Sequence, residues 1–298
     1  MNKNYKESTT EMVNVKSRDI DLQNTSTILR IINDEDKQIA IAINKVLPMI
    51  TRVVDAIFFH LKNGGRLIYI GAGSSGRIGI LDASEMDPTF NVGDNKIIGL
   101  IAGGNKAFIK PAEGVEDDEQ GAINDLKMVN CTKNDVVLGI AASGTTPYVV
   151  SGLKFAKNLG CLTVGFCMQV QTLLDEIADY VIRVITGPEV INGSTRMKAG
   201  SATKMVLNMI STALMIKDKK VYQNFMIDLK ATNIKLKKRA VNMLMEISHK
   251  SYDETLKALQ ASNYACRNAL VMLVKGVDFV GSKKLLLDNN NNLRAIIG

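Results

Sequence analysis

Carboxylate and hydroxyl side chains gather in a few short segments of this 298-residue chain, and their types suit proton transfer beside a bound anion. The segment at 71–90, GAGSSGRIGILDASEMDPTF, carries Glu85, and the acidic segment PAEGVEDDEQG carries Glu116. Most other acids in these segments fit solvated or helix-starting positions. Glu85 and Glu116 both follow strand candidates, so we expect them near the sheet edge where ligands bind. Two such carboxyls, without a histidine or metal-ligand cluster beside them, suit general acid–base catalysis at carbon and oxygen.

Three loops share small and hydroxyl-bearing residues at the expected junction of a strand and a helix: 71–77 (GAGSSGR), 142–148 (ASGTTPY) and 187–200 (GPEVINGSTRMKAG). Glycine lets the backbone approach a ligand closely, hydroxyls donate hydrogen bonds, and a helix N-terminus favours an anion. A single Ser or Thr here would be explained as a helix cap. Three such loops at strand ends favour a phosphate site. The candidate binding residues are Gly73, Ser74, Ser75, Arg77, Ser143, Thr145, Thr146, Ser194 and Lys198.

A nicotinamide cofactor is the competing interpretation of the first loop. Gly71, Gly73 and Gly76 satisfy the G-x-G-x-x-G spacing of dinucleotide-binding folds. That motif also requires an acidic residue about twenty positions further on, at the end of the second strand, to hold the ribose hydroxyl. Here the second strand candidate ends in LIAGGNK, without an acid. We therefore expect no dinucleotide at this loop.

The elements that must position these loops alternate between strand and helix. Short, β-branched, almost continuously apolar runs predict parallel strands that are buried on both faces. Helical patterns fill the intervals between them, and this alternation predicts a doubly wound α/β fold with a parallel sheet. The strands are expected at 66–70, 97–102, 135–141, 161–166 and 180–185, and the helices at about 116–129, 147–159 and 197–216.

The two ends of the chain show other patterns. The first 33 residues are expected to be irregular, followed by a long helix capped by Asn33, kinked at Pro48 and ended by Gly64 and Gly65. Beyond about residue 221 the pattern is only helical, with caps and turns at Ser251, Ser262 and 289–292. We therefore expect a sheet-containing domain with an N-terminal arm at 1–245 and a small helical domain at 246–298. Pro88 favours an extended loop conformation for Asp87.

Composition excludes several classes of protein. The chain is 46% hydrophobic with a net charge of +7, and its basic clusters at 217–220 and 235–239 fit solvated helix faces better than a nucleic-acid surface. Four cysteines without a C-x-x-C motif, and only two histidines, argue against a structural zinc site. The longest apolar stretch is interrupted by Arg52 and Asp55, which argues against a membrane span. The polar first residues lack a secretory pattern, so we expect a cytoplasmic protein with reduced thiols.

Four segments together resemble one enzyme family, the N-acetylmuramic acid 6-phosphate etherases. They are GAGSSGRIGILDASEMDPTF, AEGVEDD, GIAASGTTPYV and GPEVINGSTRMKAGSATKMVLNMISTALM. The resemblance runs in order from about TEMVN (10–14) through ATNIKLKKRA (231–240) into the helical tail, and so covers most of the chain. NGSTRMKAG is shared with the glucokinase regulatory protein and alone identifies only the broader group.

The resemblance implies a SIS (sugar isomerase) sandwich and a cofactor-free reaction. The family cleaves the ether between D-lactate and carbon 3 of a 6-phosphosugar by elimination and water addition, in bacterial cell-wall recycling. By motif match Glu85 is the proton donor, Glu116 is the second acid–base group, and the hydroxyl loops hold the phosphate. The resemblance also implies a homodimer, with no nucleic-acid or membrane partner.

This sequence departs from the family pattern at three places. Met86 and Asp87 stand where Cys-Pro is expected, Thr145 stands where many relatives have Arg, and CMQVQT (167–172) lacks an expected Asn-Pro. Two alternatives stay open, the first because NGSTRMKAG is shared with a regulatory protein. One is a non-catalytic sensor of sugar phosphates, and the other is an aldose–ketose isomerase of the same fold.

Overall fold

The computed structural model describes residues 9, 11–93, 95–110 and 112–298. These residues form two compact units, the first within 1–84 and 95–211 and the second within 85–94 and 212–298. The first eight residues, whose polar character was used above, lie outside the described part. No helix among the described residues is long and apolar enough to cross a membrane.

The strands and helices of the described chain alternate through its middle and are only helical at both ends. The strands are β1 (Leu67–Gly71), β2 (Ile97–Ile101), β3 (Val136–Ile140), β4 (Leu162–Cys167) and β5 (Tyr180–Arg183). The α-helices are α1 (Thr25–Asn44), α2 (Leu47–Lys62), α3 (Gly73–Ser84), α4 (Met86–Phe90), α5 (Gly104–Ile109), α6 (Glu119–Met128), α7 (Pro147–Leu159), α8 (Leu174–Ile177), α9 (Lys198–Lys217), α10 (Ile234–Ser248), α11 (Tyr252–Ala261), α12 (Cys266–Lys275), α13 (Phe279–Asp288) and α14 (Leu293–Ile297). Short 3-10 helices are η1 (Val15–Ser17), η2 (Ile20–Leu22) and η3 (Val115–Asp117).

The five strands form one parallel sheet in the order β2-β1-β3-β4-β5. The doubly wound α/β class is therefore confirmed, and each expected strand is present within one or two residues of its expected bounds. The strand order reverses between β1 and β3, which pair with Gly71 opposite Ile140. A reversal of this kind opens a crevice at the carboxyl ends of the two strands, where such folds bind ligands.

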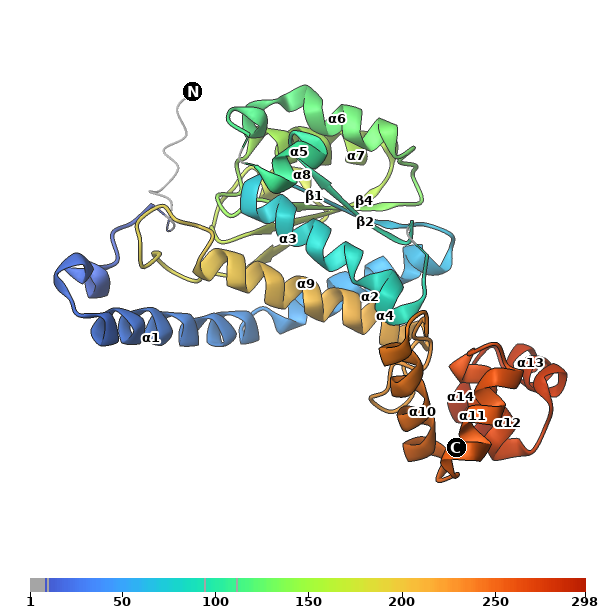
Figure 1. The fold of residues 1–298 in the computed structure, drawn as a ribbon. Coiled ribbons are helices and arrows are strands. Elements are labelled where there is room, and N and C mark those ends of the chain that lie inside the picture. Colours follow the sequence, from blue (N-terminus) through green and yellow to red (C-terminus); the bar gives the residue numbers. More distant parts are fainter. Residues whose placement is uncertain (1–8, 10, 94, 111) are drawn as a thin grey trace. The chain divides into compact units, whose positions relative to one another are not determined.

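Helices cover both faces of the sheet (Figure 1). On one face α7 lies so close to β3 that a Cβ at Gly139 would approach Val149 Cγ1 to 2.6 Å. On the other face α3 lies against Tyr69 of β1, and the buried Asp82 of α3 accepts hydrogen bonds from Tyr69 Oη at 3.1 Å and Ser211 Oγ of α9 at 3.2 Å. These contacts hold the helix starts at fixed positions beyond the strand ends.

The N-terminal region is more helical than expected. Asn24, not Asn33, caps α1, and its side chain accepts a hydrogen bond from the Thr27 backbone N–H at 2.9 Å. Asn33 lies inside α1, so the expected irregular arm of 33 residues was wrong in its second half. Pro48 lies in the first turn of α2 and begins a separate helix, because a missing N–H is tolerated in a first turn.

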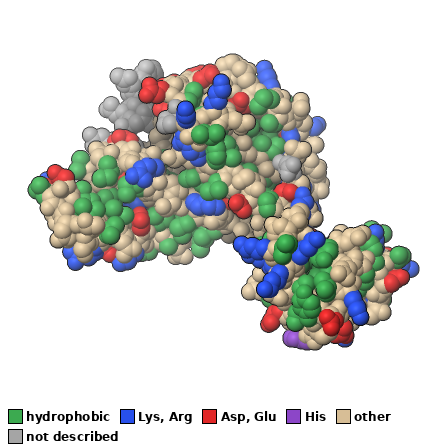
Figure 2. Space-filling view, viewed as in Figure 1, with side chains coloured by type: hydrophobic (Ala, Val, Ile, Leu, Met, Phe, Trp, Pro, Cys, Tyr) green, Lys and Arg blue, Asp and Glu red, His purple; other side chains and the backbone are tan. Residues whose placement is uncertain are grey.

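The second unit has its own apolar core. Leu244 of α10, Leu259 of α11 and Leu270 of α12 are fully buried in it together with Ile227, which precedes α10. This unit therefore extends further back along the chain than the 246–298 domain expected from the pattern. Lysine and arginine side chains are prominent around α10 (Figure 2), where residues 237–239 are exposed.

Capping and turn residues of this unit act as the sequence indicates. Ser251 forms a capping box with Glu254 at the start of α11. Asn290 and Asn291 adopt left-handed backbone conformations in the turn between α13 and α14. The segment after Glu85 differs from expectation, because Asp87 lies in α4 and not in an extended loop. Pro88 falls in the first helical turn, where it does not break the helix.

The contact between β3 and α7 predicts a defined stability effect. Gly139→Ala should lower the free energy of unfolding by about 1–3 kcal/mol, because the added Cβ would overlap Val149 and Leu153. Urea unfolding measures this change. Adding Val149→Ala removes one overlapping methyl, so the double variant should lose less than the sum of the two single losses. Strict additivity would contradict the proposed close contact.

Candidate active site

A cleft of about 380 Å³ lies at the carboxyl edge of β1 and β3 in the first unit. The last residue of β3, the loops that follow β1 and β3, η3 and two segments distant in sequence contribute to its wall. The lining residues are Glu11, Ala72, Gly73, Ser74, Ser75, Glu116, Asp117, Ile140, Ala142, Ser143, Thr145, Thr146, Pro147, Gly193 and Thr195. Most of the exposed lining is polar, which suits a hydroxylated or anionic ligand.

Close backbone packing shapes the first loop. A Cβ at Gly71 would lie 2.8 Å from the Gly76 nitrogen, and a Cβ at Gly76 would lie 2.6 Å from the Gly71 oxygen. Larger residues at either position would push the strand and helix apart. Gly73 begins α3 with φ +52°, a conformation that favours glycine. The tight turn places Ser74 and Ser75 in the first turn of α3 and in the lining of the cleft.

The second loop brings its hydroxyls to the same cleft. Gly144 has φ +71°, and a Cβ there would meet Thr172 Cβ at 2.6 Å, so the loop passes directly over Thr172. Ser143 Oγ accepts hydrogen bonds from the Thr145 backbone N–H at 3.2 Å and the Thr145 hydroxyl at 3.1 Å. Thr146 precedes α7, but its side chain makes no capping hydrogen bond. Helix capping therefore does not account for a hydroxyl at position 146.

Glu116 reaches this cleft from the middle of η3, as an exposed side chain. Gly114 precedes η3 with φ +73° and turns the chain toward the cleft. Its acidic neighbour Asp118 has a structural role, since its Oδ1 accepts hydrogen bonds from the first backbone N–H groups of α6 at 2.9 and 3.0 Å. Within the described part of the acidic segment, Glu116 and Asp117 line the cleft and the other acids do not.

The third loop only partly joins the site. Gly193 and Thr195 line the cleft, while Ser194 falls outside the lining among the described residues. The start of α9 already holds an anion, because the buried Glu189 carboxylate accepts hydrogen bonds from the Lys198 and Ala199 backbone N–H groups at 2.9 Å each. This helix N-terminus is therefore not open to a phosphate in the way expected from its sequence.

Two cations expected near the phosphate are engaged elsewhere in the structure. The buried Lys198 Nζ lies 2.6 Å from Glu35 Oε2 of α1. Arg77 donates from Nη2 to the Ala107 carbonyl at 2.7 Å and from Nε to the Phe108 carbonyl at 3.0 Å. Neither side chain is part of the described lining of the cleft. The hydroxyls and backbone of the first two loops therefore supply most of its polar surface.

Glu35 anchors the N-terminal segment to the start of α9. Besides Lys198, it accepts hydrogen bonds from Lys16 Nζ at 2.9 Å and Asn14 Nδ2 at 2.8 Å. Burial alone would raise the pKa of Glu35, but the hydrogen bonds from Lys198, Lys16 and Asn14 outweigh it and hold this pKa at about 2. The cluster stabilises the path of the chain that leads back to Glu11, whose side chain lines the cleft.

Glu85 belongs to the second unit, where it precedes α4 as an exposed residue. Its neighbour Asp87 is neutralised within that unit. Lys230 Nζ lies 2.5 Å from Asp87 Oδ2, and the Gly93 backbone N–H donates to Asp87 Oδ1 at 2.9 Å. The hydrogen bond from Lys230, followed by that from Gly93, lowers the pKa of Asp87. The added negative charge beside Glu85 is therefore compensated by a lysine.

Sequence reasoning missed several residues that shape these sites. Glu11 was assigned to an irregular arm, and Glu35 to an ordinary helix face. Glu189 lies nine residues before the start of α9, so no local capping pattern identifies it as the acid that meets this helix start. Thr195 belongs to the same hydroxyl-rich segment as Ser194, but only the structure shows which of them lines the cleft. Among the described residues, no group of three or more His, Cys, Asp or Glu side chains is placed to hold a metal ion.

Two family descriptions match parts of this chain. Residues 49–157 match the glucokinase regulatory protein N-terminal SIS domain, and residues 112–213 match the SIS domain. Together these matches span all five strands and the three hydroxyl-bearing loops.

Two named proteins also match this chain over nearly its whole length. A protein of Mycoplasma mycoides subsp. mycoides SC named N-acetylmuramic acid 6-phosphate etherase is 51% identical, and the match covers 97% of this chain and 95% of the relative. A protein of the same name from Escherichia coli O9:H4 (strain HS) is 46% identical over 98% of both chains. The structure of a phosphoheptose isomerase from Francisella tularensis shares the fold, with a TM-score of 0.52, 18% identity and coverage of 65% of this chain and 100% of that chain.

The Glu35 cluster predicts an acid-dependent loss of stability. The unfolded-state pKa of Glu35 is near 4.5 and the folded value is about 2. Its stabilising effect should therefore be complete above about pH 5 and disappear as the pH falls toward 2. At pH 7, Glu35→Gln should lower the free energy of unfolding by about 3–5 kcal/mol, because it leaves buried Lys198 without its counter-charge.

Urea unfolding at a series of pH values measures this dependence. The difference between wild type and Glu35→Gln should shrink below about pH 4.5. Asp34→Asn is the matched control, because the Asp34 pair with Lys37 is exposed and should contribute at most about 1 kcal/mol. A difference for Glu35→Gln that stays constant from pH 7 to pH 2.5 would disprove the assigned role.

Proposed function

Because this chain belongs to the family of N-acetylmuramic acid 6-phosphate etherases, we propose that it hydrolyses the D-lactyl ether of N-acetylmuramic acid 6-phosphate. The products are N-acetylglucosamine 6-phosphate and D-lactate. The reaction belongs to the recycling of cell-wall amino sugars. One observation supports the assignment to this site. Glu116 and the serine and threonine residues of the loops after β1 and β3 line the same cleft.

The phosphate is assigned to the two hydroxyl loops. Ser74 and Ser75 lie in the first turn of α3, where backbone N–H groups and the helix dipole favour an anion. Ser143 and Thr146 approach from the second loop and line the same cleft. Thr145 supports the loop through its two hydrogen bonds to Ser143. Gly73, Arg77, Ser194 and Lys198 stay predicted binding residues, the last three by motif and not by their place in the cleft.

The chemistry is elimination followed by addition. In the open-chain sugar the carbon 1 aldehyde makes the proton on carbon 2 acidic. A carboxylate removes this proton, and the electron pair forms a double bond between carbons 2 and 3 as the carbon 3–oxygen bond breaks. The leaving D-lactate oxygen takes up a proton. Water then adds at carbon 3, and carbon 2 regains a proton.

Two glutamates carry these proton transfers in the proposal. Glu116 is the base at carbon 2, supported by its exposed position in the cleft beside the phosphate loops. Glu85 is the proton donor to the leaving oxygen, an assignment supported by its motif. Lys230 pairs with the neighbouring Asp87 and so compensates its negative charge beside Glu85. General acid–base groups of this kind contribute rate factors of about 10² to 10⁴.

The protein is proposed to act as a homodimer in the cytoplasm. The apolar face of α9 is not available for such a contact, because Val206, Leu207 and Ile210 are fully buried within the first unit. α1 is the better candidate, since it extends beyond the sheet (Figure 1) and exposes Leu29 at 61% and Ile41 at 54%.

Activity tests the proposal directly. Incubation with N-acetylmuramic acid 6-phosphate should release D-lactate, detected by an enzymatic D-lactate assay. Glu116→Gln and Glu85→Gln should each lower kcat by about 10² to 10⁴ while phosphosugar binding persists. Glu119→Gln is the matched control, an exposed acid of the same segment outside the cleft, and should keep full activity. Near-normal D-lactate release by both glutamate variants would reject their catalytic roles, and tight binding without any release by wild type would favour a sensor.

Phosphate recognition gives a separate prediction. Ser75→Ala and Thr146→Ala should each weaken binding of N-acetylglucosamine 6-phosphate roughly ten- to a hundredfold, the range for a lost hydrogen bond to a charged group. Calorimetry measures the affinity, and thermal unfolding should show little change. Ser84→Ala, at the far end of α3, is the control and should bind normally. Equal wild-type affinity for phosphorylated and unphosphorylated sugar would refute the assignment.

A further inference from the structure

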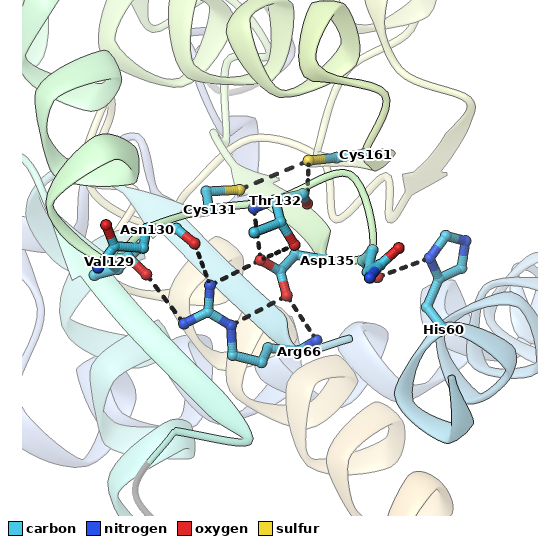
Figure 3. Close-up of polar contacts among 9 residues, drawn as sticks. His60, Arg66, Val129, Asn130, Cys131, Thr132, Asp135 and Cys161 are labelled. Atoms are coloured by element: carbon cyan, nitrogen blue, oxygen red, sulfur yellow. Dashed lines mark hydrogen bonds and ion pairs between the residues drawn. The ribbon is translucent and has the colours of Figure 1, made fainter. Parts of the chain in front are cut away.

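Two thiols face each other at the sheet edge opposite the cleft. Cys131 lies in the loop before β3, and Cys161 lies directly before β4. Their sulfur atoms are 3.6 Å apart (Figure 3), although 30 positions separate them in the sequence. β3 and β4 are adjacent parallel strands with Val136 opposite Leu162, so the sheet itself brings the two cysteines together. The proposed etherase chemistry uses neither side chain.

The two thiols differ in environment. Cys161 is 5% exposed, and its single S–H can be donated either to the Thr132 carbonyl at 3.1 Å or to the Cys131 sulfur at 3.6 Å. Cys131 is partly exposed and therefore open to a small reagent from solvent. Such an arrangement pairs an accessible sulfur with a buried sulfur directly behind it. In redox-active pairs, these are the positions of the reacting and the resolving cysteine.

Arg66 lies near Cys131 as the positive member of an ion pair. Its guanidinium donates to the Val129 and Asn130 carbonyls at 3.0 and 2.9 Å, the two residues that precede Cys131 (Figure 3). It also forms an ion pair with Asp135 at 2.8 Å, which fixes its orientation.

These surroundings act on the two thiols in opposite directions. The hydrogen bond from Cys161 lowers the pKa of Cys131, with a smaller contribution from Arg66 that works against burial and Asp135. The same shared hydrogen bond, together with burial, raises the pKa of Cys161. Cys131 is therefore the thiol of the pair that loses its proton more readily, and Cys161 the one that keeps it. A thiolate, not a thiol, is the nucleophile in oxidation.

We propose that Cys131 and Cys161 form a peroxide-reactive dithiol that closes to an intramolecular disulfide. The Cys131 thiolate attacks one oxygen of hydrogen peroxide, the O–O bond breaks, and a sulfenic acid and hydroxide result. The Cys161 sulfur then attacks the Cys131 sulfur, the S–S bond forms, and the S–O bond breaks. The departing oxygen leaves as water, taking the Cys161 proton. In sum, two thiols and one peroxide give one disulfide and two waters.

The local backbone can accommodate the closure. A disulfide requires the sulfurs to approach to about 2.0 Å, so they must move together by roughly 1.5 Å. Cys131 lies on a surface loop, where such a shift needs no change in β3. The disulfide would join the starts of β3 and β4, while the hydroxyl loops lie at the opposite strand ends. We therefore expect the oxidised protein to retain its affinity for phosphosugars.

Peroxide treatment followed by peptide mapping tests the proposal. The reduced full-length protein is exposed to a small excess of hydrogen peroxide at pH 7, and remaining thiols are alkylated. Mass spectrometry should find a Cys131–Cys161 disulfide within one chain, while Cys167 and Cys266 are alkylated. Burial raises the pKa of both of these thiols, that of Cys266 to about 12, so they should oxidise at least roughly tenfold more slowly.

Single variants separate the two roles. Cys161→Ser should stop disulfide formation and leave a Cys131 sulfenic acid that dimedone traps. Cys131→Ser should leave Cys161 reduced, and Cys266→Ser should behave as wild type. The proposal is overturned if the four cysteines react at similar rates, if Cys131 forms only disulfides between chains, or if Cys161 is the sulfur that dimedone traps in wild type and in Cys131→Ser.

Discussion

The reversal of strand order between β1 and β3 is the constraint on which the cleft depends. It sends the chain to opposite faces of the sheet after two adjacent parallel strands, so that α3 and α7 begin side by side at one edge. The mutual approach of Gly71 and Gly76 and the left-handed Gly144 then bring both loops close to the strand ends. The hydroxyls of Ser75, Ser143 and Thr146 face one cleft as a consequence, and η3 adds Glu116 to it.

Ion pairs and hydrogen bonds within the protein explain why the three hydroxyl-bearing loops differ although their compositions are similar. The third loop has the composition of an anion-binding site. However, the Glu189 carboxylate already accepts hydrogen bonds from the N–H groups at the start of α9, and Glu35 forms an ion pair with the Lys198 ammonium. A helix terminus that already contains a buried carboxylate gains nothing from a second anion. Such internal pairing fixes the segments around the cleft, and the proposed phosphate site is for that reason assigned to the first two loops.

The parts of this structure that could be predicted from sequence are those set by local pattern. Apolar β-branched runs located all five strands, and Pro147 located the start of α7. Pairings between distant residues could not be predicted, because no local signal links Glu35 to Lys198, Asp87 to Lys230 or Cys131 to Cys161. The cap of the first long helix was predicted wrongly, because Asn33 was expected to begin it, whereas Asn24 caps α1 and Asn33 lies inside that helix. Thr195 lines the cleft and adjacent Ser194 does not, a distinction of backbone geometry alone.

Hydrogen exchange at carbon 2 of the product tests the central chemical claim most directly. Wild-type protein and N-acetylglucosamine 6-phosphate are incubated in deuterated water, and proton NMR follows the carbon 2 signal. If Glu116 removes this proton in the cleft, wild type should replace it with deuterium, and Glu116→Gln should lose that exchange while still binding the phosphosugar. Release of D-lactate by a wild-type protein that never labels carbon 2 of the product would contradict elimination, and with it the role assigned to Glu116.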